Sequence, residues 1–124
     1  MAVIKAFECI RPDEKVADRV AALPYDVYNR EEALKEVERE PLSFLAIDRA
    51  ETQFDSSVDT YADCVYDKAR ELLDSRIADG TFITDTDKAY YVYELTMNGR
   101  TQTGIAACAS IDDYNNNIIK KHEN

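Results

Sequence analysis

The stretch AYYVYELTMNGRTQTGIAACAS, residues 89–110, determines how this chain folds. Asn98-Gly99 at its centre is the strongest hairpin signal a short sequence carries, because both residues tolerate positive φ. We therefore expect strands at Ala89–Met97 and Arg100–Ser110, joined by a two-residue turn that fixes their register. The expected cross-strand pairs are Val92 with Ile105, Tyr93 with Gly104 and Leu95 with Gln102.

Three helices are predicted upstream of this hairpin. The first opens at Pro12, which suits a first helical turn, and ends before Pro24. The second opens with a capping box, Asn29 to Glu32, and closes at Pro41. The longest runs from about Asp59 to Asp79 and stops at Gly80. One of its faces is apolar, with Tyr61, Ala62, Val65, Ala69, Leu72 and Leu73.

Arg76 falls on the same face of the longest predicted helix. A long cationic side chain at such a position either extends to the rim of the apolar face or reaches an anion. The sequence leaves both readings open.

Further strands and turns are expected between and after these helices. Ala2–Glu8 is predicted to be a strand, and the compact apolar run Ser43–Ile47 a buried strand. The polar stretch 48–57 is predicted to be a loop, and 112–117 a polar turn. Ile118-Ile119 is predicted to begin another strand.

These elements predict an α+β fold, with a mixed, largely antiparallel sheet and helices mainly on one face. The 124 residues suit a single domain. The apolar pair Ile118-Ile119 runs into a dense charged cluster, so we expect residues 1–124 to be the N-terminal portion of a longer protein.

Composition excludes several classes of function. Apolar residues make up 45% of the chain and charged residues 32%, which is typical of a globular protein. The net charge of −10 opposes direct binding to nucleic acid or an anionic membrane. Three widely spaced cysteines, Cys9, Cys64 and Cys108, are predicted to be unpaired thiols of a cytoplasmic protein. The oligomeric state stays open, with a homo-oligomer as one outcome.

Few residues offer chemistry of their own. The chain has one histidine, His122, no phosphate-binding glycine loop and no spacing typical of a metal site. The cluster Lys120-Lys121-His122-Glu123 is the most promising, because two ammonium groups and an imidazole suit a phosphate and a carboxylate suits a general base. The alternative for this cluster is a solvated, charged surface.

A second candidate is Pro24-Tyr25-Asp26-Val27, a short bend between two predicted helices. Tyr25 and Asp26 at this bend either face a substrate pocket or, in the case of Asp26, cap the turn. No metal ligands are predicted.

Several motifs, in order along the whole chain, resemble the family known as domain of unknown function 1015. They are Met1-Ala2-Val3-Ile4-Lys5 with Arg11-Pro12, Pro24-Tyr25-Asp26-Val27, Pro41-Leu42-Ser43-Phe44-Leu45, Gly80, Gln102-Thr103-Gly104-Ile105 and Ile119-Lys120-Lys121-His122-Glu123. Family members are longer and usually carry a downstream G-H-H-R segment. That segment resembles the phosphate-contacting box of ParB-like and sulfiredoxin-like proteins, a group that includes nucleotide hydrolases and free-serine kinases.

The resemblance implies a nucleotide-dependent kinase of a small molecule, such as the amino acid serine, using ATP or ADP with Mg²⁺. In that reading His122 and Glu123 are catalytic and Lys120 and Lys121 bind phosphate. The resemblance also leaves an alternative, a non-enzymatic binding or assembly module of a ParB-like regulator.

Overall fold

The computed structural model describes residues 1–121 and forms two compact units. The hairpin unit consists of Met1–Cys9 and the described residues from Thr84 on, and the helical unit is Ile10–Ile83. The chain therefore passes between the units at residues 9–10 and again at 83–84. That residues 1–124 make one domain, and the N-terminal portion of a longer protein, stays a prediction.

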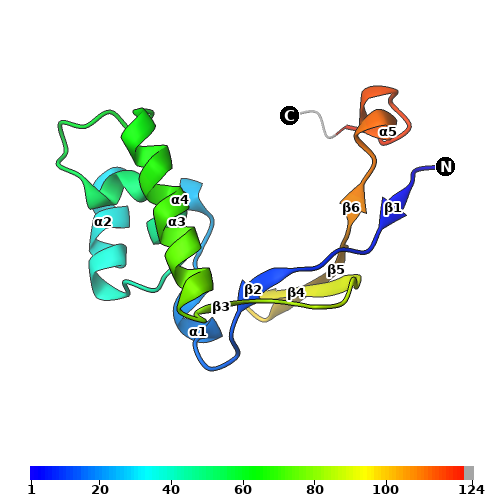
Figure 1. Cartoon of the computed structure of the whole chain (residues 1–124), viewed down its shortest axis with the longest axis horizontal. Coiled ribbons are helices and arrows are strands. Elements are labelled where there is room, and N and C mark those ends of the chain that lie inside the picture. The colour runs from blue at the N-terminus through cyan, green and yellow to red at the C-terminus, as the bar shows by residue number, and fades with distance from the viewer. Residues whose placement is uncertain (122–124) are drawn as a thin grey trace. The chain divides into compact units, whose positions relative to one another are not determined.

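The α+β class predicted from the sequence is confirmed, and Figure 1 labels the elements. The helices are α1 (Ala17–Val20), α2 (Arg30–Arg39), α3 (Leu45–Asp48), α4 (Asp63–Ala78) and α5 (Ile111–Asn115), with 3₁₀ turns η1 (Tyr25–Val27) and η2 (Ala50–Gln53). The strands are β1 (Ile4–Lys5), β2 (Ile10–Pro12), β3 (Phe82–Thr84), β4 (Tyr91–Met97), β5 (Arg100–Ala106) and β6 (Cys108–Ala109). Within residues 1–121 these strands form three pairs, β1–β6, β2–β3 and β4–β5, where the sequence predicted one sheet.

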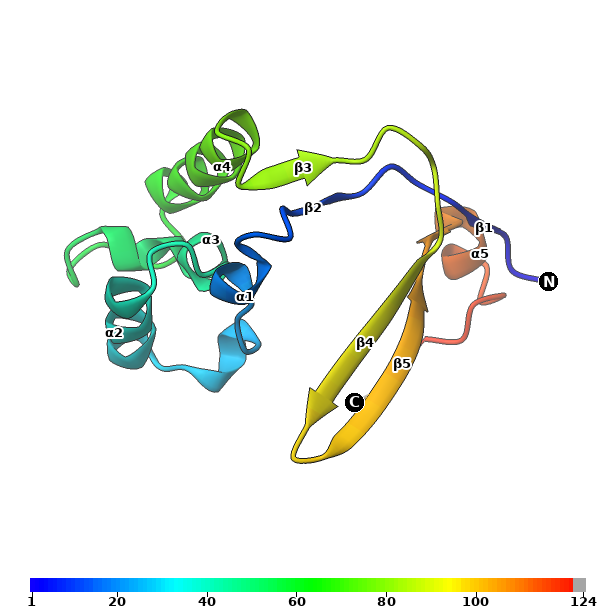
Figure 2. The same ribbon diagram turned by 90° about the horizontal axis from the view of Figure 1, so that it is seen from below.

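The β4–β5 hairpin has the register that the Asn98-Gly99 turn predicts. Val92 pairs with Ile105, Tyr93 with Gly104 and Leu95 with Gln102. Asn98 has a φ of 51° and Gly99 a φ of 75°, so both turn residues are left-handed, as a type I′ turn requires. Figure 2 shows the two strands as one antiparallel ribbon.

The alternation of side chains gives one face of β4 a row of large apolar side chains. Side chains alternate along a strand, so Tyr93, Leu95 and Met97 share a face. Tyr93 is 60% exposed and Met97 67%. A two-stranded hairpin is marginally stable by itself in water, so this face needs a covering surface.

Replacing Gly99 with Ala should destabilise the hairpin by about 1 kcal/mol, because an L side chain is strained at positive φ. Gly104→Ala is the matched control. Gly104 has no positive φ, and no heavy atom lies within 4 Å of the position a Cβ would take. Alanine there should instead stabilise the strand by about 0.5 kcal/mol. Urea unfolding followed by the amide NMR signals of β4 measures both changes, and equal losses would contradict the turn assignment.

Tyr91 joins the hairpin to the N-terminal segment of the same unit. Its hydroxyl donates to Asp85 Oδ2 at 2.8 Å and accepts from the Cys9 amide at 3.1 Å. Its ring lies 5.1 Å from the ring of Phe7, centre to centre. The predicted strand Ala2–Glu8 is present only as β1 and a bridge from Phe7 to Ala89.

Two predictions for the end of the chain are wrong. The polar turn expected at 112–117 is largely the helix α5, because the Ser110 hydroxyl accepts from the Asp113 amide and caps its first turn. Ile118 and Ile119 form no strand. Instead, the amides of both residues donate to the Asp113 carbonyl, at 2.9 and 3.1 Å, and these two bonds close the C-terminal end of α5.

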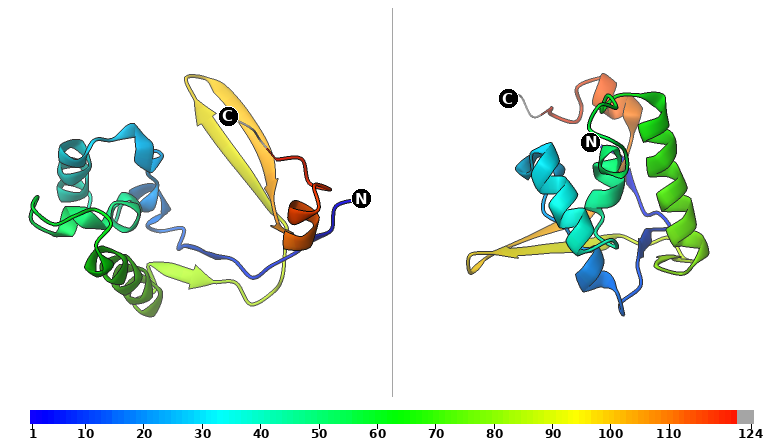
Figure 3. Two further views of the ribbon diagram at one scale, coloured as in Figure 1. Left: turned by 90° about the horizontal axis from the view of Figure 1, so that it is seen from above. Right: turned by 90° about the vertical axis from the view of Figure 1, so that its left-hand side faces the viewer.

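The core of the helical unit lies between α2, α3 and α4, which Figure 3 shows grouped together. The buried cluster contains Ala33, Val37, Leu45 and Ala46, with Tyr28 and Leu72 packed against it. The buried strand predicted at Ser43–Ile47 is wrong, because this run forms α3. A lone strand would leave buried amides and carbonyls unpaired, whereas a helical turn pairs them internally, as the Ala46 amide does with the Ser43 carbonyl.

The helix ends follow local signals where these exist. The predicted capping box is confirmed, since the Glu32 amide donates to Asn29 Oδ1 and the Asn29 amide to Glu32 Oε2, both at 2.9 Å. Gly80 has a φ of 83° and follows the end of α4. The first predicted helix shrinks to α1, because Pro12 belongs to β2 and the Asp13 amide donates to the Thr81 carbonyl.

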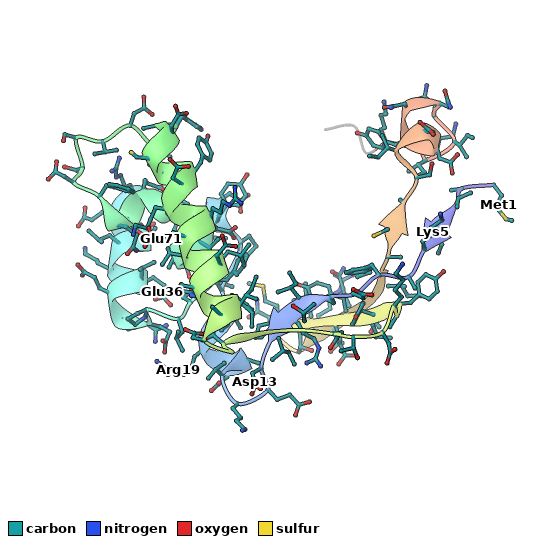
Figure 4. All side chains as sticks on the ribbon, viewed as in Figure 1. Met1, Lys5, Asp13, Arg19, Glu36 and Glu71 are labelled. Carbon is teal, nitrogen blue, oxygen red and sulfur yellow. The ribbon has the colours of Figure 1, made fainter. Side chains whose placement is uncertain are left out.

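Surface ion pairs engage many cations of the helical unit. Arg19 of α1 donates twice to Glu40, at 2.9 and 3.0 Å, Arg39 pairs with Glu36, and Lys68 pairs with Glu71. Figure 4 labels Arg19, Glu36 and Glu71. Exposed ion pairs add only about 0–1 kcal/mol each to the free energy of unfolding, so their main effect is to neutralise these cations. The surplus of acidic residues then has no cations left to balance it in these pairs.

Arg76 reaches neither the rim nor an anion. It is only 4% exposed, and its guanidinium donates to the carbonyls of Pro41 (2.7 Å), Leu42 (3.0 Å) and Ser43 (3.2 Å). These carbonyls precede α3, so Arg76 fixes the chain where it enters the core. A buried guanidinium is tolerated there because its donors are satisfied.

Replacing Arg76 with Met should lower the free energy of unfolding by about 2–4 kcal/mol, since the carbonyls it serves lose their donor inside the protein. Arg70→Met is the control on the same helix, because the Arg70 side chain is 84% exposed. It should change stability by no more than about 0.5 kcal/mol. Urea denaturation compares the two, and similar small losses would show that the carbonyls find water instead.

Candidate functional site

A pocket of about 440 Å³ opens in the helical unit. It lies between η1, the α3–η2 segment and the N-terminal half of α4. Its lining residues are Tyr25, Asp26, Ile47, Asp48, Arg49, Ala50, Glu51, Thr60, Tyr61, Val65, Tyr66 and Ala69. This volume is in the range of small-molecule sites.

Arg49 holds two walls of the pocket together. Its Nη1 donates to the carbonyls of Tyr25 at 3.1 Å and Tyr28 at 2.7 Å, while its Nε donates to Glu51 Oε1 at 2.6 Å. The Glu51 side chain is only 2% exposed, so its charge requires a partner, which Arg49 supplies. The η1 turn is thereby fastened to η2.

Arg30 fixes the loop that leads into the third wall. From the first turn of α2 it donates to the carbonyls of Asp55 at 3.1 Å and Val58 at 2.9 Å. Asp59 then accepts from the Tyr61 amide at 2.8 Å, so this segment is a turn and α4 begins only at Asp63. The helix predicted from about Asp59 starts later for this reason.

Tyr61 is consequently placed at the pocket and not on the buried face of a helix, where the sequence put it. It is 79% exposed, and Tyr25 and Tyr66 are also well exposed. The lining also includes the buried apolar residues Ala50 and Val65. The pocket thus combines apolar and aromatic lining residues.

Two carboxylates give the pocket its charge. Within residues 1–121, the side chains of Asp26 and Asp48 make no hydrogen bond and no ion pair. Although Asp48 as a residue is exposed, partial burial of its carboxyl group raises its pKa above the ordinary 3.8. Arg49 and Glu51 neutralise each other, so the lining carries a surplus of two negative charges.

Tyr25 and Asp26 are both among the lining residues of this pocket. One reading of the bend, that Asp26 caps the turn, is wrong. The backbone closes η1 through the Val27 amide and the Pro24 carbonyl, and the Asp26 carboxylate accepts nothing from residues 1–121. Their role toward a substrate stays a prediction.

Lys120 and Lys121 lie in the hairpin unit, and both are exposed. The Lys121 ammonium stands 4.5 Å from the centre of the Tyr114 ring, a cation–π contact. His122 and Glu123 lie outside the described residues, so the predicted phosphate cluster stays a prediction.

Sequence reasoning missed Asp48, Arg49, Tyr61 and Tyr66. Asp48 and Arg49 fell in an expected loop, where no local pattern marks them. Tyr61 had a usable signal, because Asp55 and Asp59 both bond to an amide two residues on, as turn-forming aspartates do.

Other kinds of site are absent from the described part of the chain. Among residues 1–121 no group of three or more His, Cys, Asp or Glu side chains could hold a metal ion. In the same residues Cys9, Cys64 and Cys108 form no disulfide, and none of the helices is both long and apolar enough to cross a bilayer.

Fold and site together define an α+β protein with a pocket of small-molecule size. The chain belongs to the family described as "Protein of unknown function (DUF1015)", whose model matches residues 4–124. Comparison with curated proteins gave no match, and comparison with solved structures gave none.

Replacing Asp48 with Asn should raise the free energy of unfolding at pH 7, and the gain should vanish in acid. A raised pKa means that the folded protein binds more protons than the unfolded protein between pH 3.8 and the folded value. The free energy of unfolding therefore falls as pH rises through that window. An Asn side chain does not ionise, so it does not carry the cost of a partly buried charge. Thermal unfolding between pH 3 and 7 tests this, and a gain independent of pH would contradict it.

Proposed function

We propose that this chain is the N-terminal portion of a cytoplasmic, nucleotide-dependent kinase of a small amino acid such as serine. The pocket of about 440 Å³ at Tyr25 and Asp26 is the observation that carries the proposal. It supplies carboxylates for an ammonium group and is large enough for an amino acid. Membership of the family is compatible with the proposal but assigns no activity.

The phosphate chemistry is assigned to the charged cluster. Lys120 and Lys121 bind the phosphate of ATP or ADP, and His122 and Glu123 handle the proton. The serine hydroxyl oxygen attacks the terminal phosphorus while its proton passes to the Glu123 carboxylate. The bond from that phosphorus to the bridging oxygen breaks and releases the shortened nucleotide. Among residues 1–121 no group of three or more His, Cys, Asp or Glu side chains could hold the Mg²⁺, so one or two carboxylates and the nucleotide phosphates would have to hold it.

In the natural full-length protein, Lys121→Ala should lower phosphoryl transfer to serine about tenfold, and Glu123→Gln about a hundredfold, since one removes a charge contact and the other the base. Lys88→Ala, at another exposed lysine of the hairpin unit, is the control and should keep full turnover. Product formation from ATP and from ADP is the assay.

If both variants keep wild-type turnover, the cluster is a solvated surface. If calorimetry shows that the full-length protein binds no nucleotide, the kinase proposal fails.

The alternative is a non-enzymatic binding or assembly module of a ParB-like regulator. The exposed apolar face of the hairpin, at Tyr93, Leu95 and Met97, favours it, because such faces mark interaction surfaces. A surplus of negative charge limits this module to protein partners, including a second copy of itself. Self-association without nucleotide binding is the result that would select it.

A further inference from the structure

We infer that the pocket lined by Tyr25, Asp26, Asp48, Tyr61 and Tyr66 binds the ammonium group of an organic cation, such as a primary amine or the amino end of an amino acid. The inference rests on the proposed function only in treating this pocket as a substrate site. It holds whether or not a phosphoryl group is transferred.

The charges of the lining select a cation. Asp26 and Asp48 receive no hydrogen bond or ion pair from residues 1–121, so each carboxylate has its acceptor capacity available. Arg49, the cation in the lining, is already engaged by Glu51 and by two backbone carbonyls. A free inorganic anion such as phosphate would meet two like charges here, and the cation of the lining is already paired with Glu51, which disfavours such an anion.

The tyrosines select an organic cation over a metal ion. Tyr25, Tyr61 and Tyr66 all line the pocket and are all more than half exposed, so their rings are accessible to a ligand. An ammonium group over an aromatic face gains a cation–π attraction in addition to its bonds to carboxylates. The described residues bring no third acid ligand to the pair, and about 440 Å³ far exceeds a bare ion.

The size of the pocket and the apolar part of its lining describe the rest of the ligand. Ile47, Ala50 and Val65 line the pocket beside the acids, so a short aliphatic chain attached to the ammonium group finds an apolar wall. The ligand class is therefore an amine with a small aliphatic body. The phosphates of the proposed kinase's nucleotide would have to be held by residues outside this lining.

The test uses n-butylammonium as the probe and n-butanol as its uncharged counterpart, titrated into the chain and followed by amide NMR signals. Butylammonium should shift the signals of the lining residues, and butanol should bind at least about tenfold more weakly. Asp26→Asn and Asp48→Asn should each weaken butylammonium binding about threefold or more. Glu38→Gln removes the same charge from an exposed position on α2, outside the lining, and should leave binding unchanged.

A second pair of variants tests the aromatic contact. Tyr61→Phe keeps the ring face and should retain butylammonium binding, while Tyr61→Leu should weaken it. Both changes are at an exposed residue, so the fold should survive, and circular dichroism checks that it does.

Equal binding of butanol and butylammonium, or full binding by the folded Asp26→Asn and Asp48→Asn variants, would overturn the inference. So would inorganic phosphate shifting the same signals at lower concentration. A protein that phosphorylates serine but does not bind butylammonium refutes this inference alone. One that binds butylammonium but transfers no phosphoryl group refutes only the kinase proposal.

Discussion

The bonds of the Arg49 guanidinium are the interaction on which the candidate site depends. Glu51 is buried and would be costly as an unpaired charge, so its partner must stay in place. The same guanidinium holds the carbonyls of Tyr25 and Tyr28, and so fixes the turn that carries Asp26. The helical unit has few long elements, and the hydrogen bonds of a partly buried arginine help to hold its loops in place. Arg76 does the same for the chain entering α3.

Local chemistry explains which elements could be predicted from the sequence. The Asn98-Gly99 turn, the Asn29–Glu32 capping box and Gly80 each determine structure within a few residues, and all three predictions are confirmed. The strand predicted at Ser43–Ile47 failed because a short apolar run indicates that a segment is buried, not what pairs its backbone. That pairing depends on neighbours far along the chain, such as Val20, whose carbonyl accepts from the Phe44 amide. At Ile118-Ile119 the apolar pair did not indicate burial either, since Ile118 is 47% exposed.

The candidate site could be predicted only in part, for the same reason. A bend between helices drew attention to Tyr25 and Asp26, and the pocket contains both. Asp48 and Tyr61 reach it only because Arg49 and Arg30 hold distant loops in place, through bonds to carbonyls that carry no mark in the sequence. Backbone acceptors are the same for every residue type, so a pattern of side chains cannot reveal them.

The hairpin constrains both proposals in the same way. Its face at Tyr93, Leu95 and Met97 also carries Gln102 and Arg100 from β5, and no acidic residue, although acids outnumber basic residues by 25 to 15 in the chain. Two strands with such a face do not persist uncovered in water. If the protein is a kinase, residues outside the hairpin would have to supply the cover. If it is an assembly module, the cover is a partner. Within residues 1–121 the outer edges of β4 and β5 pair with no further strand, so they give that partner backbone groups to bond as well as an apolar face to bury.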